Sequence, residues 1–112
     1  MYREGWMPKL PSVTNLLENP LSHEEQFHEL VSSGAARLEH IVSHGQASEP
    51  GFWYDQESDE WVVLIQGSAC LEFTAGEVFL QAGDCLTIPA HMKHRVSSVS
   101  QDAVWLALHF LV

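Results

Sequence analysis

A ten-residue stretch, FWYDQESDEW (residues 52–61), places four carboxylates beside aromatic rings. Its acidic residues are Asp55, Glu57, Asp59 and Glu60, and an apolar run over residues 62–65 follows directly. These carboxylates either form a solvated loop ahead of a buried strand, or some of them point inward to hold something. An inward carboxylate needs a metal, a hydrogen-bond donor or a cation, because burying it without one costs a large desolvation free energy.

The composition limits the classes of protein to consider. The chain has 112 residues, the length of one domain, and an apolar fraction of 46% that is ordinary for a globular core. Five Lys plus Arg against fifteen Asp plus Glu give a net charge of −10, which leaves no basic stripe for phosphates or an anionic membrane. We therefore expect neither nucleic acid nor membrane partners. With no run of eighteen apolar residues, we expect a cytoplasmic protein.

The first 35 residues predict an arm and a short helix. Three prolines within residues 1–20 disfavour a long regular element and favour an extended arm. Ser22 and Glu25 have the spacing of a helix capping box, and Gly34 stands where a helix commonly ends. Apolar positions at 27, 30 and 31 would form one helical face, so a helix is expected over residues 22–33.

From residue 36 onward, short apolar or alternating segments are separated by turn residues such as those at 67–68, 75–76 and 82–84. This pattern predicts an all-β fold. Antiparallel strands joined by tight turns need a second layer, or closure into a barrel, to bury their apolar face. A sandwich or a small barrel is therefore expected, and no domain boundary interrupts the pattern.

Two motifs within residues 37–110 resemble those of the cupin superfamily. The first cupin motif ends in a glutamate, six intervening residues and a glycine, which Glu60 and Gly67 match. The second has a glycine, five residues, a proline, four residues and a histidine, which Gly83, Pro89 and His94 match. The resemblance implies a small jelly-roll (double-stranded β-helix) barrel over residues 36–112. Residues 1–112 would then be a single cupin domain, with residues 1–35 as its N-terminal arm and helix.

The sequence departs from the cupin pattern where the metal ligands belong. Cupins carry two histidines before the motif glutamate, and their places here fall to Trp53 and Asp55 or, with a shorter gap, to Tyr54 and Gln56. The usual site of three histidines and one glutamate therefore does not carry over whole.

A reduced metal site remains possible on this resemblance. Glu60 and His94 carry over, and Asp55 is the favoured replacement for a lost histidine. Two carboxylates and one imidazole suit a divalent metal such as Mn, Fe or Zn with positions open for water or substrate. Gln56 could add a neutral oxygen.

Four other residues are candidates for lining the substrate pocket. Trp53 and Tyr54 are more often core or dimer contacts, although aromatic rings near a barrel mouth commonly shape a pocket. His91 follows a proline in an expected rim loop. His109 shares one face of the last strand with Trp105, and either face of that strand could line the pocket.

Two functions fit these residues. The first is a metal-dependent cupin that binds or transforms a small polar metabolite, with the metal as Lewis acid. The alternative is a non-catalytic small-molecule-binding cupin that has lost the metal. Loss of both motif histidines favours the alternative, whereas retention of Glu60 and His94 favours the first. We also expect a homodimer, because small cupins usually pair their sheets and because the apolar residues of the arm need a surface to cover.

Overall fold

The computed structural model describes residues 10–19 and 22–111. Within this part of the chain the protein is all-β, as predicted, and has eight strands: β1 (Gln26–Ser33), β2 (Ala36–Val42), β3 (Asp59–Gln66), β4 (Ser68–Phe73), β5 (Gly76–Gln81), β6 (Cys85–Ile88), β7 (His94–Val99) and β8 (Val104–Phe110). No helix in these described ranges is long and apolar enough to cross a membrane.

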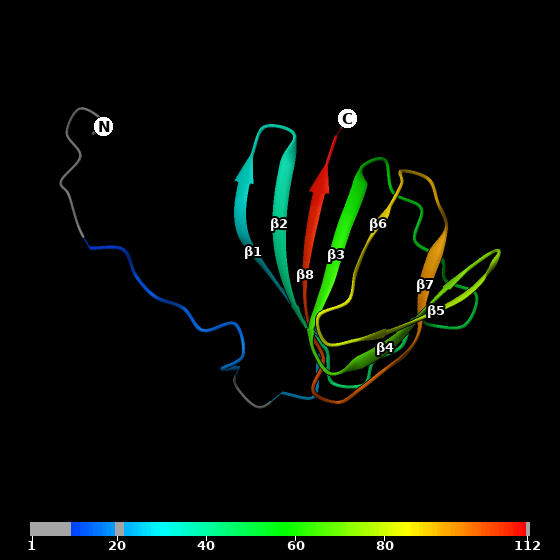
Figure 1. Cartoon of the computed structure of the whole chain (residues 1–112), viewed down its shortest axis with the longest axis horizontal. Helices are drawn as coiled ribbons and strands as arrows, with labels where there is room; N and C mark the ends of the chain where they lie inside the picture. The colour runs from blue at the N-terminus through cyan, green and yellow to red at the C-terminus, as the bar shows by residue number, and fades with distance from the viewer. Residues whose placement is uncertain (1–9, 20–21, 112) are drawn as a thin grey trace.

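The strands form two antiparallel sheets (Figure 1). One sheet has five strands in the order β1-β2-β8-β3-β6, and the other has three in the order β5-β4-β7. The core contains side chains from both sheets, which alternate with outward-facing residues along each strand. Its most buried members include Val62, Leu64, Leu71, Trp105 and Ala107.

The two sheets are not closed into a barrel, so this part of the prediction is wrong. Among the described residues, β6 pairs only with β3, and β7 pairs in a ladder only with β4. Strand β6 is four residues long and is followed by Pro89, which has no N–H to extend a ladder. The arrangement is an open pair of facing sheets.

The helix predicted over residues 22–33 is also wrong, because residues 26–33 form β1 and pair with β2. The register shifts between Glu29 and Val31, which is a β-bulge. The inserted residue moves Val31 to the face opposite Phe27, so apolar residues four apart, which would share one face of a helix, lie on opposite faces of β1. The Glu25 carboxylate, expected in a capping box, instead accepts a hydrogen bond from the Ser43 hydroxyl at 2.9 Å.

The arm is described from residue 10 to residue 19, and its other predicted residues, including Trp6, lie outside the described residues. The described segment has no helix or strand. Figure 1 shows it running away from the sheets toward the N-terminus. It meets the body at His40 of β2, whose Nε2 donates to the Leu16 carbonyl at 3.0 Å.

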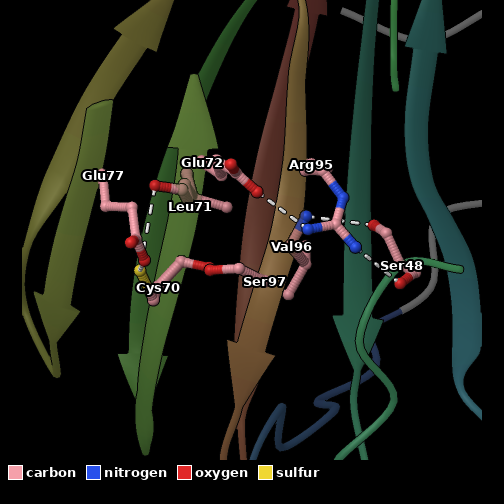
Figure 2. Close-up of polar contacts among 8 residues, drawn as sticks. All are labelled: Ser48, Cys70, Leu71, Glu72, Glu77, Arg95, Val96 and Ser97. Atoms are coloured by element: carbon pink, nitrogen blue, oxygen red, sulfur yellow. Dashed lines mark hydrogen bonds and ion pairs between the residues drawn. The ribbon is translucent and has the colours of Figure 1, made fainter. Parts of the chain in front are cut away.

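The long connection over residues 43–58 is fixed to the edge of the small sheet at β7. Figure 2 shows Arg95 of β7 between two acceptors, the Glu72 carboxylate at 2.8 Å and the Ser48 carbonyl at 3.0 Å. Farther along the connection, Tyr54 and His94 exchange two backbone hydrogen bonds of 2.7 and 3.1 Å. These contacts hold Tyr54 and the following residues at the mouth of the space between the sheets.

Candidate functional site

Strand register brings Glu60 and His109 together on the inner face of the large sheet. Glu60 lies directly opposite His109 in the pairing of β3 with β8, and both side chains are buried. Glu60 precedes Val62 and Leu64 on the buried face of β3, since every second residue of a strand points the same way. The face of the last strand that carries His109 is therefore the one that lines the cavity.

His94 approaches Glu60 from the opposite sheet. It is the first residue of β7, and its ring is buried and stacked on Tyr54 with centroids 5.4 Å apart. Its Nδ1 donates to the Met92 carbonyl at 3.0 Å, so the neutral ring presents a lone pair at Nε2. This Nε2 lies 3.6 Å from Glu60 Oε1.

Glu60 is the polar group most in need of a partner at this site. Its Oε1 is buried and has no hydrogen-bond partner among the described residues. Burial raises the pKa of the Glu60 carboxyl, although His109 and His94 act in the opposite direction. Two acceptors, a carboxylate oxygen and an imidazole lone pair, thus face each other. A proton or a cation between them would satisfy both.

A second carboxylate, Glu39 of β2, completes the cluster. His109 Nε2 donates to Glu39 Oε1 at 3.3 Å and lies 4.0 Å from Glu60 Oε2. The other oxygen of Glu39 accepts a hydrogen bond from Arg37 at 3.2 Å. Sequence reasoning did not identify Glu39, because its place depends on the register between β2 and β8.

These residues line a cavity of about 90 Å³ between the sheets. Its polar lining includes a third carboxylate, Glu25, and the amide of Gln56, while most of the remaining lining is apolar or aromatic. Burial raises the pKa of Glu25, and the nearby charge of Glu39 acts in the same direction. None of the described lining residues is Lys or Arg. The cavity therefore favours neutral or cationic groups over anions.

The structure does not bring Asp55 together with Glu60 and His94. Its carboxylate accepts a hydrogen bond from His91 Nδ1 at 2.8 Å, and both side chains are exposed. The His91 backbone N–H donates to the Gln56 carbonyl at 2.8 Å, and His91 adopts a φ of 63°. This pair joins two loops at the rim, and His91, predicted as a pocket residue, does not line the cavity between the sheets. Trp53 is half-buried and does not line the cavity, whereas Tyr54 does.

The donors in the cavity fit a divalent metal in part. Within the described residues, no three His, Cys, Asp or Glu side chains already lie in positions to hold an ion. Glu60 Oε1 and His94 Nε2 do fit, since bonds of about 2.1 Å to each atom would span their separation. His109 and Glu39 lie beside this pair, with His109 Nε2 4.0 Å from Glu60 Oε2, whereas the Asp55 predicted from the sequence pairs with His91 at the rim.

Two facing antiparallel sheets around a small cavity with a carboxylate and imidazole cluster agree with the all-β fold of the family that the sequence motifs predict. The sequence profile of the cupin domain matches residues 38–109, and the chain belongs to this family. The predicted family is thereby confirmed. No functionally curated protein matches the chain.

Solved structures support the same assignment. A protein of Ralstonia eutropha JMP134, whose name proposes mannose-6-phosphate isomerase activity, shares 39% identity over 91% of this chain and 100% of its own, with a TM-score of 0.85. A cupin superfamily protein of Desulfitobacterium hafniense DCB-2 is 17% identical over 84% of each chain, with a TM-score of 0.73. A protein of unknown function from Streptococcus pyogenes is 16% identical over 93% of this chain and 90% of its own, with a TM-score of 0.74. The last two similarities establish the fold alone.

Proposed function

We propose that this chain is a metal-dependent cupin that binds or transforms a small polar metabolite in the cavity between its sheets. One observation supports the metal above others: the buried Glu60 Oε1 faces the Nε2 lone pair of His94 at 3.6 Å with no proton donor available from the described residues. A divalent cation would satisfy both atoms at once.

The chain's own residues prepare this site in specific ways. The Met92 carbonyl fixes the His94 tautomer, and so keeps Nε2 free of a proton. Glu39 orients the His109 ring by accepting its Nε2–H. A bound metal would supply Lewis-acid polarisation of a substrate oxygen. Burial raises the pKa of Glu60, so without metal its carboxyl keeps a proton to higher pH than an exposed glutamate does.

The charge of the cavity restricts the ligand class. Three carboxylates line it, and the described lining includes no Lys or Arg. The substrate in the name of the Ralstonia relative carries a phosphate, which would meet these carboxylates without a cationic side chain to pair with. We therefore favour an uncharged or cationic metabolite, bound through hydroxyl or amino groups, over a sugar phosphate.

Metal titration of protein purified without an affinity tag tests the proposal. Calorimetry with Mn²⁺, Fe²⁺ and Zn²⁺ should give one site per chain for at least one metal. Glu60→Gln and His94→Ala should each weaken binding at least about tenfold, whereas His91→Ala at the rim should not. Absence of binding at millimolar metal, or equal binding by all variants, would reject a metal site at Glu60 and His94.

A binding protein without metal is the second candidate. It is favoured by the loss of both motif histidines and by the absence of three assembled ligands within the described residues. Glu60 and His94 would then share a proton and serve as a hydrogen-bonding pair for the ligand. Saturable binding of a small amine or polyol in the presence of EDTA would support this candidate.

A further inference from the structure

The part of the cavity that β1 and β2 form carries more negative than positive charge. Glu25 directly precedes β1, and both it and Phe27 line the cavity. Phe27 lies opposite Ile41 of β2, and Ile41 and Glu39 line the cavity beside them. We call these four residues the β1–β2 wall. Farther along β1, Glu29 lies directly opposite Glu39. Like charges directly opposite each other destabilise a strand pair, so a cation beside this wall would be stabilising.

Glu25 is the carboxylate of the wall that has no cationic partner among the described residues. Glu39 accepts hydrogen bonds from Arg37 at 3.2 Å and from His109 at 3.3 Å. Glu25 accepts one from the neutral Ser43 hydroxyl and forms no ion pair with a described residue. Burial raises the pKa of Glu25, and the charge of Glu39 raises it further. A cation at Glu25 would offset both effects.

The Glu60 carboxylate indicates independently that this cavity holds a ligand. Glu60 is 8% exposed, and its Oε1 has no hydrogen-bond partner among the described residues. Buried polar atoms are normally paired, so an unpaired one that faces a cavity indicates a bound group. Tyr54 connects this centre to the wall, because burial raises the pKa of its phenol and the charges of Glu25, Glu60 and Glu39 raise it further. The Glu60 centre and the β1–β2 wall therefore belong to one ligand site.

We propose that the metabolite carries a protonated primary amine that binds Glu25 at the β1–β2 wall, while an uncharged polar group of the same molecule reaches Glu60 and His94. This assignment rests on the proposed function, which makes the cavity the ligand site. A primary ammonium has three N–H donors and no acceptor, so it can bond Glu25 and the Tyr54 phenol oxygen together. The Phe27 ring beside Glu25 adds attraction for a cation. A hydroxyl group would leave the Glu25 charge unpaired, and an anion would be repelled by it.

The dimensions and the openness of the cavity restrict this amine further. Its volume of about 90 Å³ is well below the roughly 300–1,000 Å³ of pockets for drug-sized ligands, so a short chain fits better than a nucleotide. Phe27 is 52% exposed, so the wall meets solvent on the β1 side and a charged group can enter there without crossing the apolar core. The net charge of −10 raises the local concentration of cations around the protein.

Matched small ligands test the charge that the site prefers. Straight-chain amino alcohols of about three to six carbons are titrated into the full chain by calorimetry near pH 7, once with metal and once in EDTA. The diol and the hydroxy acid of the same chain length are the neutral and anionic controls. At least one amino alcohol should bind at least about tenfold more tightly than its diol, and its hydroxy acid should bind more weakly than the diol.

Glu25→Gln tests where the amine binds. The variant keeps a side-chain oxygen for the Ser43 hydroxyl and removes only the charge. It should reduce the preference for the amino alcohol over the diol at least about tenfold, both with metal and in EDTA. Glu24→Gln, at the adjacent exposed carboxylate outside the cavity lining, is the matched control and should keep the preference.

Four results would each overturn the amine assignment. They are equal binding of amino alcohol and diol, tighter binding of the hydroxy acid, no saturation by any amino alcohol at millimolar concentration, and an unchanged preference in Glu25→Gln. Failure of the proposed function appears separately, as a lack of metal binding in the titration without amine. Selective binding of the amino alcohol in EDTA would then still support the amine at Glu25.

Discussion

Replacing Glu60 by Gln should stabilise the metal-free protein at neutral pH, a reversal of the usual effect of changing a buried residue. The Glu60 carboxylate is buried, and one of its oxygens faces the His94 lone pair without a proton donor from the described residues. A glutamine has nearly the same shape and carries no charge. Its amide N–H could donate to His94 Nε2, which would turn two facing acceptors into a donor and an acceptor.

The size of the gain follows from the cost of an unsatisfied buried group, about 1–3 kcal/mol. For a domain of this size, each kcal/mol shifts the melting temperature by roughly 4 °C or more. The gain should depend on pH. Burial raises the Glu60 pKa above its ordinary 4.5, so the folded state keeps the proton to higher pH than the unfolded state does. The stability contributed by that proton is complete below pH 4.5 and is lost as the pH rises through the raised pKa. The advantage of the variant should therefore be small near pH 4 and grow toward pH 7.

Urea unfolding in EDTA between about pH 4 and pH 8 measures this difference. Glu57→Gln, at an exposed carboxylate in the preceding loop, is the control and should show no such trend. Added metal should reduce the advantage of the variant, because a metal at about 100 times its wild-type dissociation constant stabilises the wild type by about 2.7 kcal/mol and a variant that binds tenfold more weakly by only about 1.4 kcal/mol. Two results would refute the reasoning. One is a Glu60→Gln protein that is less stable than the wild type in EDTA at pH 7. The other is a stability advantage that is as large near pH 4 as at pH 7.

Three further outcomes are expected from the structure. Gly67→Ala should lower the free energy of unfolding in urea by more than about 2 kcal/mol, because the φ of Gly67 is +89° and a Cβ would lie 2.9 Å from the Ala103 backbone. Gly83→Ala is the control: its φ is +97° but a Cβ would meet open space, so the loss should be about 1 kcal/mol. Asp55→Asn should change the metal affinity measured by calorimetry less than about twofold, because the exposed Asp55 carboxylate pairs with His91 at the rim. A loss of affinity of tenfold or more would instead show that Asp55 is a metal ligand. Burial lowers the His40 pKa below 6.5, so this residue contributes stability that is present above pH 6.5 and is lost as the pH falls through the lowered pKa. His40→Gln should therefore flatten the stability profile below pH 6.5.

The sequence predicted the all-β class and most strand positions, because their signals are local. Turn residues at 67–68, 75–76 and 82–84 separate the predicted apolar segments, which correspond to β3, β4, β5 and β6. The error at β1 arose because the spacing of Phe27 and Val31 fits one face of a helix, whereas pairing with β2 and a bulge place them on opposite faces of a strand. The prediction of a closed barrel was also wrong, because closure depends on strand pairing between the two sheets, and no local sequence pattern indicates that pairing.

The residues of the candidate site likewise fall into those that a local sequence motif predicted and those that depend on strand pairing. Motif spacing identified Glu60 and His94, which the structure brings to one cavity from different sheets. Glu39 gave no signal, because only the register of β2 against β8 places it near His109. Asp55 lies only one residue from Gln56 and yet ends at the rim, since consecutive residues of an extended segment point in opposite directions.

Losing the two histidines of the first cupin motif therefore does not empty this cavity of donors. Those histidines would have come from the connection before β3, which here supplies Tyr54 and Gln56 to the cavity lining. Glu60 still lies between two imidazoles, His94 from β7 and His109 from β8. Glu60, His94 and His109 all lie on paired strands, so sheet hydrogen bonds hold their positions, and their geometry should resist changes in the loop. The rim residues can therefore vary with the ligand while Glu60, His94 and His109 keep their positions.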